Sequence, residues 1–174
     1  MTTTALEEIG KVSYESILDM VAALQCDYDR LEELHDERDN YEPETDEDGS
    51  QLLDENGTAL TWYDANPDDA EELSELEAAA GDCTSEDDAR ERIQDDPLSL
   101  RIFGERIDGE WQADRFELLL TTGGPAVRIM GELDDSEPTR AWLEVQDWGT
   151  PWTDYYQEGI GDVLLDYCRV FCFG

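Results

Sequence analysis

The chain of 174 residues is long enough for one hydrophobic core, with or without an acidic extension. Its 47 Asp and Glu face 11 Lys and Arg, which gives a formal net charge of −36. This charge excludes direct binding to nucleic-acid phosphates, because such binding needs Lys and Arg to displace counterions. It also disfavours binding to an anionic membrane. The expected partner is therefore a basic protein.

The N-terminal residues, MTTTALEEI, contain neither the basic nor the apolar segment of a signal peptide. No apolar run approaches the length that a bilayer requires. The cysteines, at positions 26, 83, 168 and 172, form no Cys-x-x-Cys pair, which favours reduced thiols. We therefore expect an intracellular protein. We also expect no cofactor.

Residues 14–35 have the seven-residue periodicity of an amphipathic helix. The repeating positions alternate by three and four along Tyr14, Ile17, Val21, Leu24, Tyr28, Leu31 and His35. We predict one continuous helix that ends near Asn40, before Pro43. Its apolar seam either packs on the rest of the molecule, which we favour, or pairs with a second copy as a homodimer. The opposite face is acidic and carries Asp27, Asp29, Glu32, Glu33, Asp36, Glu37 and Asp39.

The segment that follows contains turn and capping signals. Residues 42–50 predict an acidic loop, and residues 51–63 predict a small hairpin about Asn56-Gly57. Asn66-Pro67 starts a helix that Gly81 ends. A shorter helix should run from Ser85, as its cap, to Asp96-Pro97.

Three apolar runs of strand length lie between Phe116 and Trp148, separated by Gly123-Gly124-Pro125 and an acidic turn at 134–138. They predict an antiparallel meander. The alternation of Leu98, Leu100 and Ile102 adds a strand before it, and Asp162 opens a C-terminal helix. The fold class is α+β, with a three- to four-stranded sheet. An acidic helical region at 1–97 and the sheet with its helix at 98–174 should form one compact domain.

The sequence offers little support for catalysis, so we do not expect the protein to be an enzyme. The single histidine, His35, lies at a heptad position, which favours a core or rim role over that of a general base. No Gly-x-Ser-x-Gly motif is present. Gly123-Gly124-Pro125 lacks the Lys and the helix of a phosphate loop, so it is read as a hairpin turn. Cys168 and Cys172 share one helix face, where core packing is favoured over a metal site.

Calcium binding is a third functional hypothesis. Glu44, Asp46, Asp48 and Glu55 follow the ligand spacing of an EF-hand loop, with Gly49 at the sixth place. Glu replaces the usual first Asp, and Asn56-Gly57 interrupts the helix that should follow. A chance match in an acidic run is therefore favoured.

Aromatic residues are dense near the C-terminal part, at Trp142, Trp148, Trp152, Tyr155 and Tyr156. Packing of the sheet on the C-terminal helix is favoured as their role. An exposed patch that binds a partner is the alternative.

Four segments carry a resemblance to known sequences. They read AAGDC (79–83), DDPLS (95–99), LLTTGGPAVRI (119–129) and QDWGTPWT (146–153). With these segments the chain resembles a widespread family of small acidic hypothetical proteins carried by bacterial plasmids, phages and integrated elements. The resemblance covers roughly residues 70–174 and implies an origin on a mobile element, without implying catalytic residues. In charge and size alone, the chain is similar to DNA-mimicking antirestriction and anti-CRISPR inhibitors.

The leading functional hypothesis is a DNA mimic that occupies the DNA-binding surface of a host defence complex or another basic DNA-binding protein. Carboxylates three or four residues apart on a helix lie ~5–6 Å from one another, close to the phosphate spacing along a strand. The expected contact residues are Asp29, Glu32, Glu33, Asp36, Glu37, Asp39, Glu42, Glu44, Asp46, Glu47, Asp48, Asp68, Asp69, Glu72, Glu86, Asp87 and Asp88.

The second hypothesis is a structural or regulatory protein whose acidity is an adaptation to high salt. One lysine against ten arginines suits that reading, although a GC-rich genome explains the ratio equally well. Salt adaptation should also acidify the whole surface. Here residues 1–100 hold a net −27 of the total of −36, which favours a localised function.

Overall fold

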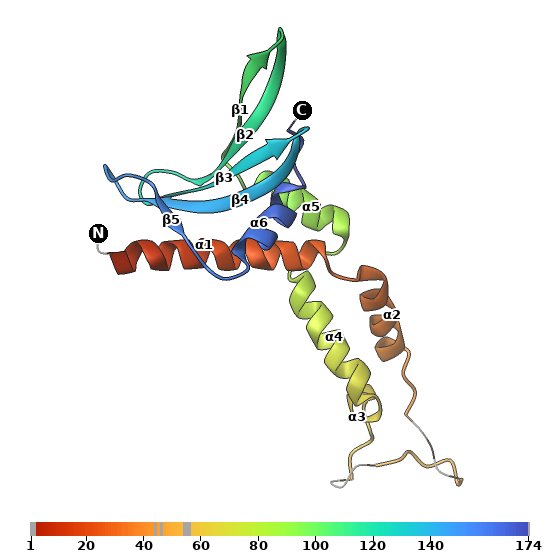
Figure 1. Cartoon of the computed structure of the whole chain (residues 1–174). Helices are drawn as coiled ribbons and strands as arrows, with labels where there is room; N and C mark the ends of the chain where they lie inside the picture. The colour runs from red at the N-terminus through yellow and green to blue at the C-terminus, as the bar shows by residue number, and fades with distance from the viewer. Residues whose placement is uncertain (1–2, 44, 46, 54–56, 174) are drawn as a thin grey trace.

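The structure of the protein is a computed structural model that describes residues 3–43, 45, 47–53 and 57–173. It confirms the α+β class (Figure 1). The helices are α1 (Thr3–Leu24), α2 (Tyr28–Asp39), α3 (Trp62–Ala65), α4 (Pro67–Ala80), α5 (Glu86–Asp95) and α6 (Ile160–Cys168). The strands are β1 (Ser99–Ile107), β2 (Glu110–Thr121), β3 (Ala126–Asp134), β4 (Glu137–Gln146) and β5 (Thr153–Tyr155).

The strands form one antiparallel sheet in the order β1-β2-β3-β4-β5, so the predicted meander is confirmed and gains a short fifth strand. Asp135 and Ser136, with φ of 50° and 67°, make the tight turn between β3 and β4. Asp108 and Gly109, with φ of 53° and 91°, make the turn between β1 and β2. Asp-Gly is a strong signal for such a turn, and it identifies a hairpin that our sequence prediction did not include.

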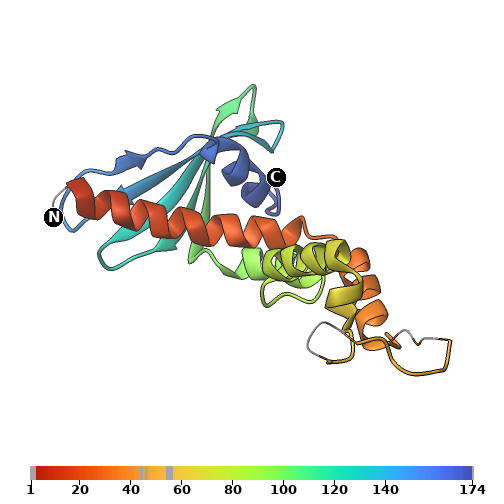
Figure 2. The same cartoon turned by 90° about the horizontal axis from the view of Figure 1, so that it is seen from below.

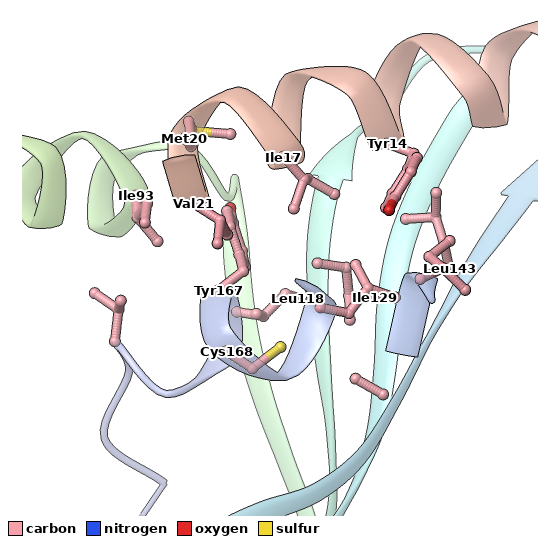
Figure 3. Close-up of a cluster of buried hydrophobic side chains, with 14 of the residues drawn as sticks. Tyr14, Ile17, Met20, Val21, Ile93, Leu118, Ile129, Leu143, Tyr167 and Cys168 are labelled. Carbon is pink, nitrogen blue, oxygen red and sulfur yellow. The ribbon is translucent and has the colours of Figure 1, made fainter. Parts of the chain in front are cut away.

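Two helices cover one face of the sheet. Figure 2 shows α1 lying across the strands with α6 beside it. Gly10 allows α1 to approach β5 closely, because a Cβ atom there would lie 2.4 Å from the ring of Tyr155. Figure 3 shows the core between the layers, with side chains at most 4% exposed: Ile17, Val21, Leu118, Ile129, Leu143, Tyr167 and Cys168. The first part of the heptad seam therefore packs within the molecule, as expected.

The prediction of one continuous helix over residues 14–40 is wrong, because the chain turns at residues 25–27. Asp27 caps a new helix there by accepting a hydrogen bond from the backbone N–H of Arg30 at 3.0 Å. Tyr28 holds the turn by donating from its hydroxyl to the carbonyl of Ala23 at 2.9 Å. The heptad spacing continues in phase across the break, but Leu24 packs in the main core while Leu31 packs in a second core. The buried residue of α2 is Leu34, which lies beside the heptad positions.

The other predicted elements fit more closely. The helix begun by Pro67 ends at Ala80, and Ser85 caps α5 by accepting from the N–H of Asp88. In the 51–63 segment, an antiparallel bridge joins Leu53 to Ala59, while the expected turn at Asn56 falls outside the described residues. Among the described helices, none is both long enough and apolar enough to cross a bilayer.

Candidate functional site: an acidic helical arm

The described parts of residues 28–80 project from the sheet and its covering helices as an arm (Figures 1 and 2). Helix α2 leads away from the body, a connecting segment and α3 form the far end, and α4 returns beside α2. This arm contains 20 acidic and two basic residues, a net charge of −18, which is half of the −36 of the whole chain. The acidic helix face predicted from the sequence is thus part of a separate protrusion.

A small core of its own holds the arm together. Leu34, Trp62 and Leu73 are at most 5% exposed, and Leu31, Tyr41, Ala70 and Leu76 pack around them. Thr61 and Asp64 form a reciprocal capping box that starts α3 and directs Trp62 inward. Hydrogen bonds from Thr61 hold the pKa of Asp64 below its usual range. The acidic faces therefore rest on a packed support.

Arg30 links the two long helices of the arm. Its Nη2 lies 3.0 Å from Asp69 and 2.9 Å from Glu72, both on α4, and the hydrogen bond to Glu72 raises the pKa of Arg30. Its Nη1 lies 3.5 Å from Glu33 and 3.9 Å from Glu37, on α2. One guanidinium thus faces four carboxylates, so the cluster keeps a negative charge.

A second set of contacts lies further along the same two helices. Arg38 lies 2.9 Å from Asp39 and 3.6 Å from Glu77, and the Nε2 atom of His35 lies 2.9 Å from Glu77. His35 is partly exposed, which confirms the rim position that was one of its two expected places. These pairs fix α2 against α4 without neutralising the arm.

Several predicted contact residues remain exposed without a basic neighbour among the described residues. They are Asp29, Glu32 and Asp36 on α2 and Asp68 on α4. Glu42, Glu47 and Asp48 are also exposed, in the segment that leads to the far end of the arm. Glu44 and Asp46 lie outside the described residues.

The remaining predicted contacts lie on α5, at the base of the arm. Asp29 from α2 and Glu86 and Asp87 from α5 line one hollow of about 450 Å³, beside Tyr28. Burial raises the pKa of Tyr28 to about 12. Asp88 is engaged locally, because its carboxylate accepts from the backbone N–H of Thr84 at 2.9 Å. The structure therefore brings Asp29 together with two acids that are distant in sequence.

Sequence analysis missed a charge network on the uncovered face of the sheet. Glu117, only 6% exposed, accepts from Arg128 at 2.7 Å and pairs with Arg101 at 3.4 Å. Arg128 also binds Glu144, which accepts from the indole of Trp142 at 3.0 Å. The sequence does carry a sign of this network. In each of three neighbouring strands, one charged residue lies between apolar residues: Glu117, Arg128 and Glu144.

The aromatic side chains between positions 142 and 156 do not pack between the sheet and α6, which was the favoured prediction. The Arg128 guanidinium stacks on Trp152 at 4.1 Å, and Trp142 lies beside Arg140 on the same uncovered face. Trp148 and Tyr156 are 75% and 82% exposed. Only Tyr155 of the group packs against a covering helix, with its ring 6.5 Å from that of Tyr14 in α1. The indole of Trp148 occupies the space that a Cβ atom at Gly124 would fill.

No group of three or more His, Cys, Asp or Glu side chains among the described residues is placed to hold a metal ion. The calcium hypothesis relied on Glu44, Asp46 and Glu55, which lie outside the described residues. In comparisons with known proteins, no family model matches the chain, and no curated protein or solved structure matches it significantly.

Proposed function

We propose that the protein is a DNA mimic whose acidic arm occupies the DNA-binding surface of a basic protein in the cytoplasm of a bacterial host. Restriction and CRISPR complexes are the kind of target that such an inhibitor fits. The observation that carries the proposal is the arm itself: a projecting pair of helices with its own core, in a stretch, residues 28–80, that holds half of the net charge.

The charge density of the arm supports the proposal. Helices α2 and α4 hold 12 acidic and two basic residues, a net charge of −10. Their 12 and 14 residues span about 18–21 Å at ~1.5 Å per residue. Duplex DNA carries one charge per ~1.7 Å of axis, or about 11–12 charges over that length. A channel lined with Lys and Arg would meet a similar field from either molecule.

The distribution of charge distinguishes this function from salt adaptation. An adaptation of the whole surface would spread acids evenly, whereas residues 28–80 hold a net −18 in less than a third of the chain. The body also exposes basic residues: Arg101 and Arg140 have side chains 65% and 69% exposed. Mimicry requires a local field of this kind, and solubility does not.

The test is a gel-shift assay in which the protein and duplex DNA compete for a DNA-binding defence complex. We expect the wild-type protein to displace the DNA and to lose affinity steeply with added salt, because ion pairs with the target are screened. Reversing Asp29, Glu32, Asp36 and Asp68 to Lys should abolish displacement, since these acids have no basic partner in the described structure. Each single reversal should have a small effect, because exposed ion pairs contribute ~1 kcal/mol or less.

A matched control reverses Glu7, Glu8, Asp19 and Glu158, which are exposed on the body. This control changes the net charge equally and should leave displacement intact. Simultaneous binding of DNA and protein by the target would contradict mimicry. An equal loss of DNA displacement in the two quadruple variants would contradict it as well.

A further inference from the structure

The two edges of the sheet differ. The β5 edge has three residues, and its Tyr155 packs against Gly10 and Tyr14 of α1. The β1 edge has nine residues and no strand on its outer side among the described residues. Natural sheets shorten or cover their edges to prevent pairing with another chain. The β5 edge is protected in both ways, and the β1 edge in neither.

The composition of β1 favours pairing. Leu100 and Ile102 are 38% and 37% exposed, and Leu98, just before the strand, is 59% exposed. Residues 98–107 contain two arginines and one glutamate, so this edge is slightly positive in a chain of net charge −36. Two copies of so acidic a protein repel one another least where their local charge is not acidic.

The strand is also regular along its length. The register between β1 and β2 shifts between Phe103 and Gly104, but the additional residue, Asp114, belongs to β2. The outer edge of β1 therefore runs without a bulge from Ser99 to Ile107, with Phe103 at its centre.

We propose that β1 pairs antiparallel with β1 of a second copy about a two-fold axis at Phe103, which joins the two sheets into one. This register pairs the whole strand with itself. It places Arg101 opposite Glu105 of the second copy, and Glu105 opposite Arg101 of that copy, so that each contact occurs twice. Opposite charges at directly opposed positions stabilise an antiparallel pair, and the same two side chains specify the register.

Sedimentation velocity of the full chain tests the association. The wild-type protein should sediment as a dimer at tens of micromolar, and Glu105→Arg should weaken dimerisation at least tenfold, because it sets Arg opposite Arg twice. Adding Arg101→Glu to Glu105→Arg restores opposite charges and should restore the dimer. A monomeric wild-type protein, or a dimer that Glu105→Arg leaves unchanged, would overturn the proposal.

Disulfide cross-linking tests the register without relying on charge. Directly opposed Cα atoms lie ~4.5–5.5 Å apart, within disulfide range, so Phe103→Cys should give a covalent dimer on oxidation. The matched control is Ile107→Cys, which the same register places about 26 Å from its counterpart, at ~3.3 Å per residue. Both variants carry Cys172→Ser, because Cys172 is an exposed thiol. Equal cross-linking in the two variants would contradict the two-fold axis at Phe103.

Discussion

At the scale of single residues, the contacts of Arg30 explain how an acidic arm stays folded. Two helices with 12 acidic residues between them lie side by side, and Arg30 joins four of these carboxylates. Removing the guanidinium leaves Asp69 and Glu72 facing the acids of α2 without a bridge. The repulsion that results acts over several ångströms and is screened by salt.

We therefore predict that Arg30→Ala lowers the melting temperature by a few degrees at low salt and by much less at 1 M NaCl. Thermal unfolding followed by circular dichroism at both salt concentrations measures the difference. Arg169→Ala serves as control, because Arg169 pairs with Asp166 alone among the described acids. A loss that is the same at both salt concentrations would show that Arg30 acts by packing and not by charge.

Tyr167 gives a residue-scale prediction for the main core. It is fully buried and donates to Asp96 at 2.6 Å, and burial raises its pKa far above the usual value. The unfolded chain loses the phenolic proton near pH ~10, while the folded chain keeps it. Because the folded state then binds more protons, stability falls as pH rises above ~10, by roughly 1.4 kcal/mol per pH unit for this group.

Tyr167→Phe should lower stability by about 1–2 kcal/mol at pH 7, through the lost hydrogen bond. It should also make the alkaline decline shallower than in the wild-type protein. Denaturant unfolding between pH 7 and pH 11 measures both effects. The control Tyr156→Phe, at a side chain 82% exposed, should leave the slope unchanged. An unchanged slope in Tyr167→Phe would mean that this residue ionises in the folded protein.

At the scale of elements, local chemistry made much of the fold predictable from sequence. The meander follows from its turn residues, α4 from Pro67 and Gly81, and α5 from the Ser85 cap, and their bounds fit closely. Asn66, the expected cap of α4, makes no side-chain capping hydrogen bond. The break between α1 and α2 was missed because the heptad continues in phase across it. Periodicity shows which side of a helix is buried, but not that Asp27 caps a second helix.

The residues of the candidate site could be predicted from the sequence, but their arrangement in space could not. The run of acids from Asp29 to Asp39 is visible in sequence, whereas the contact of Arg30 with α4 depends on residues 39 and 42 positions away. The network around Glu117 depends on strand register, which a sequence pattern alone leaves open. Long-range pairing of this kind follows only from the folded chain.

Because α1 and α2 pack in two different cores, substitutions of buried residues in the two helices should act differently. Ile17→Ala, in the main core, should lower global stability by roughly 2–5 kcal/mol. Leu34→Ala, in the arm, should speed hydrogen exchange in α2 and α4 while the amides of β3 and β4 keep their protection. Mass-spectrometric exchange on both variants measures this. Faster exchange in β3 and β4 of Leu34→Ala would show that the two cores unfold together.

At the scale of the whole molecule, charge and packing are divided between regions. The body carries the sheet, the covering helices and a core of apolar and aromatic side chains. The arm carries half of the net charge on a core of three buried residues. Binding by the arm and association through β1 would therefore use surfaces on different elements, and neither would require the main core to change.

The separate core of the arm also bears on how the protein can evolve. The residues of the arm core have no member in common with those of the main core. Insertions, deletions and charge changes in residues 28–80 can therefore accumulate without repacking the sheet. We expect variation among related sequences to be greatest in the arm, so that one inherited body can present different acidic surfaces as its targets change.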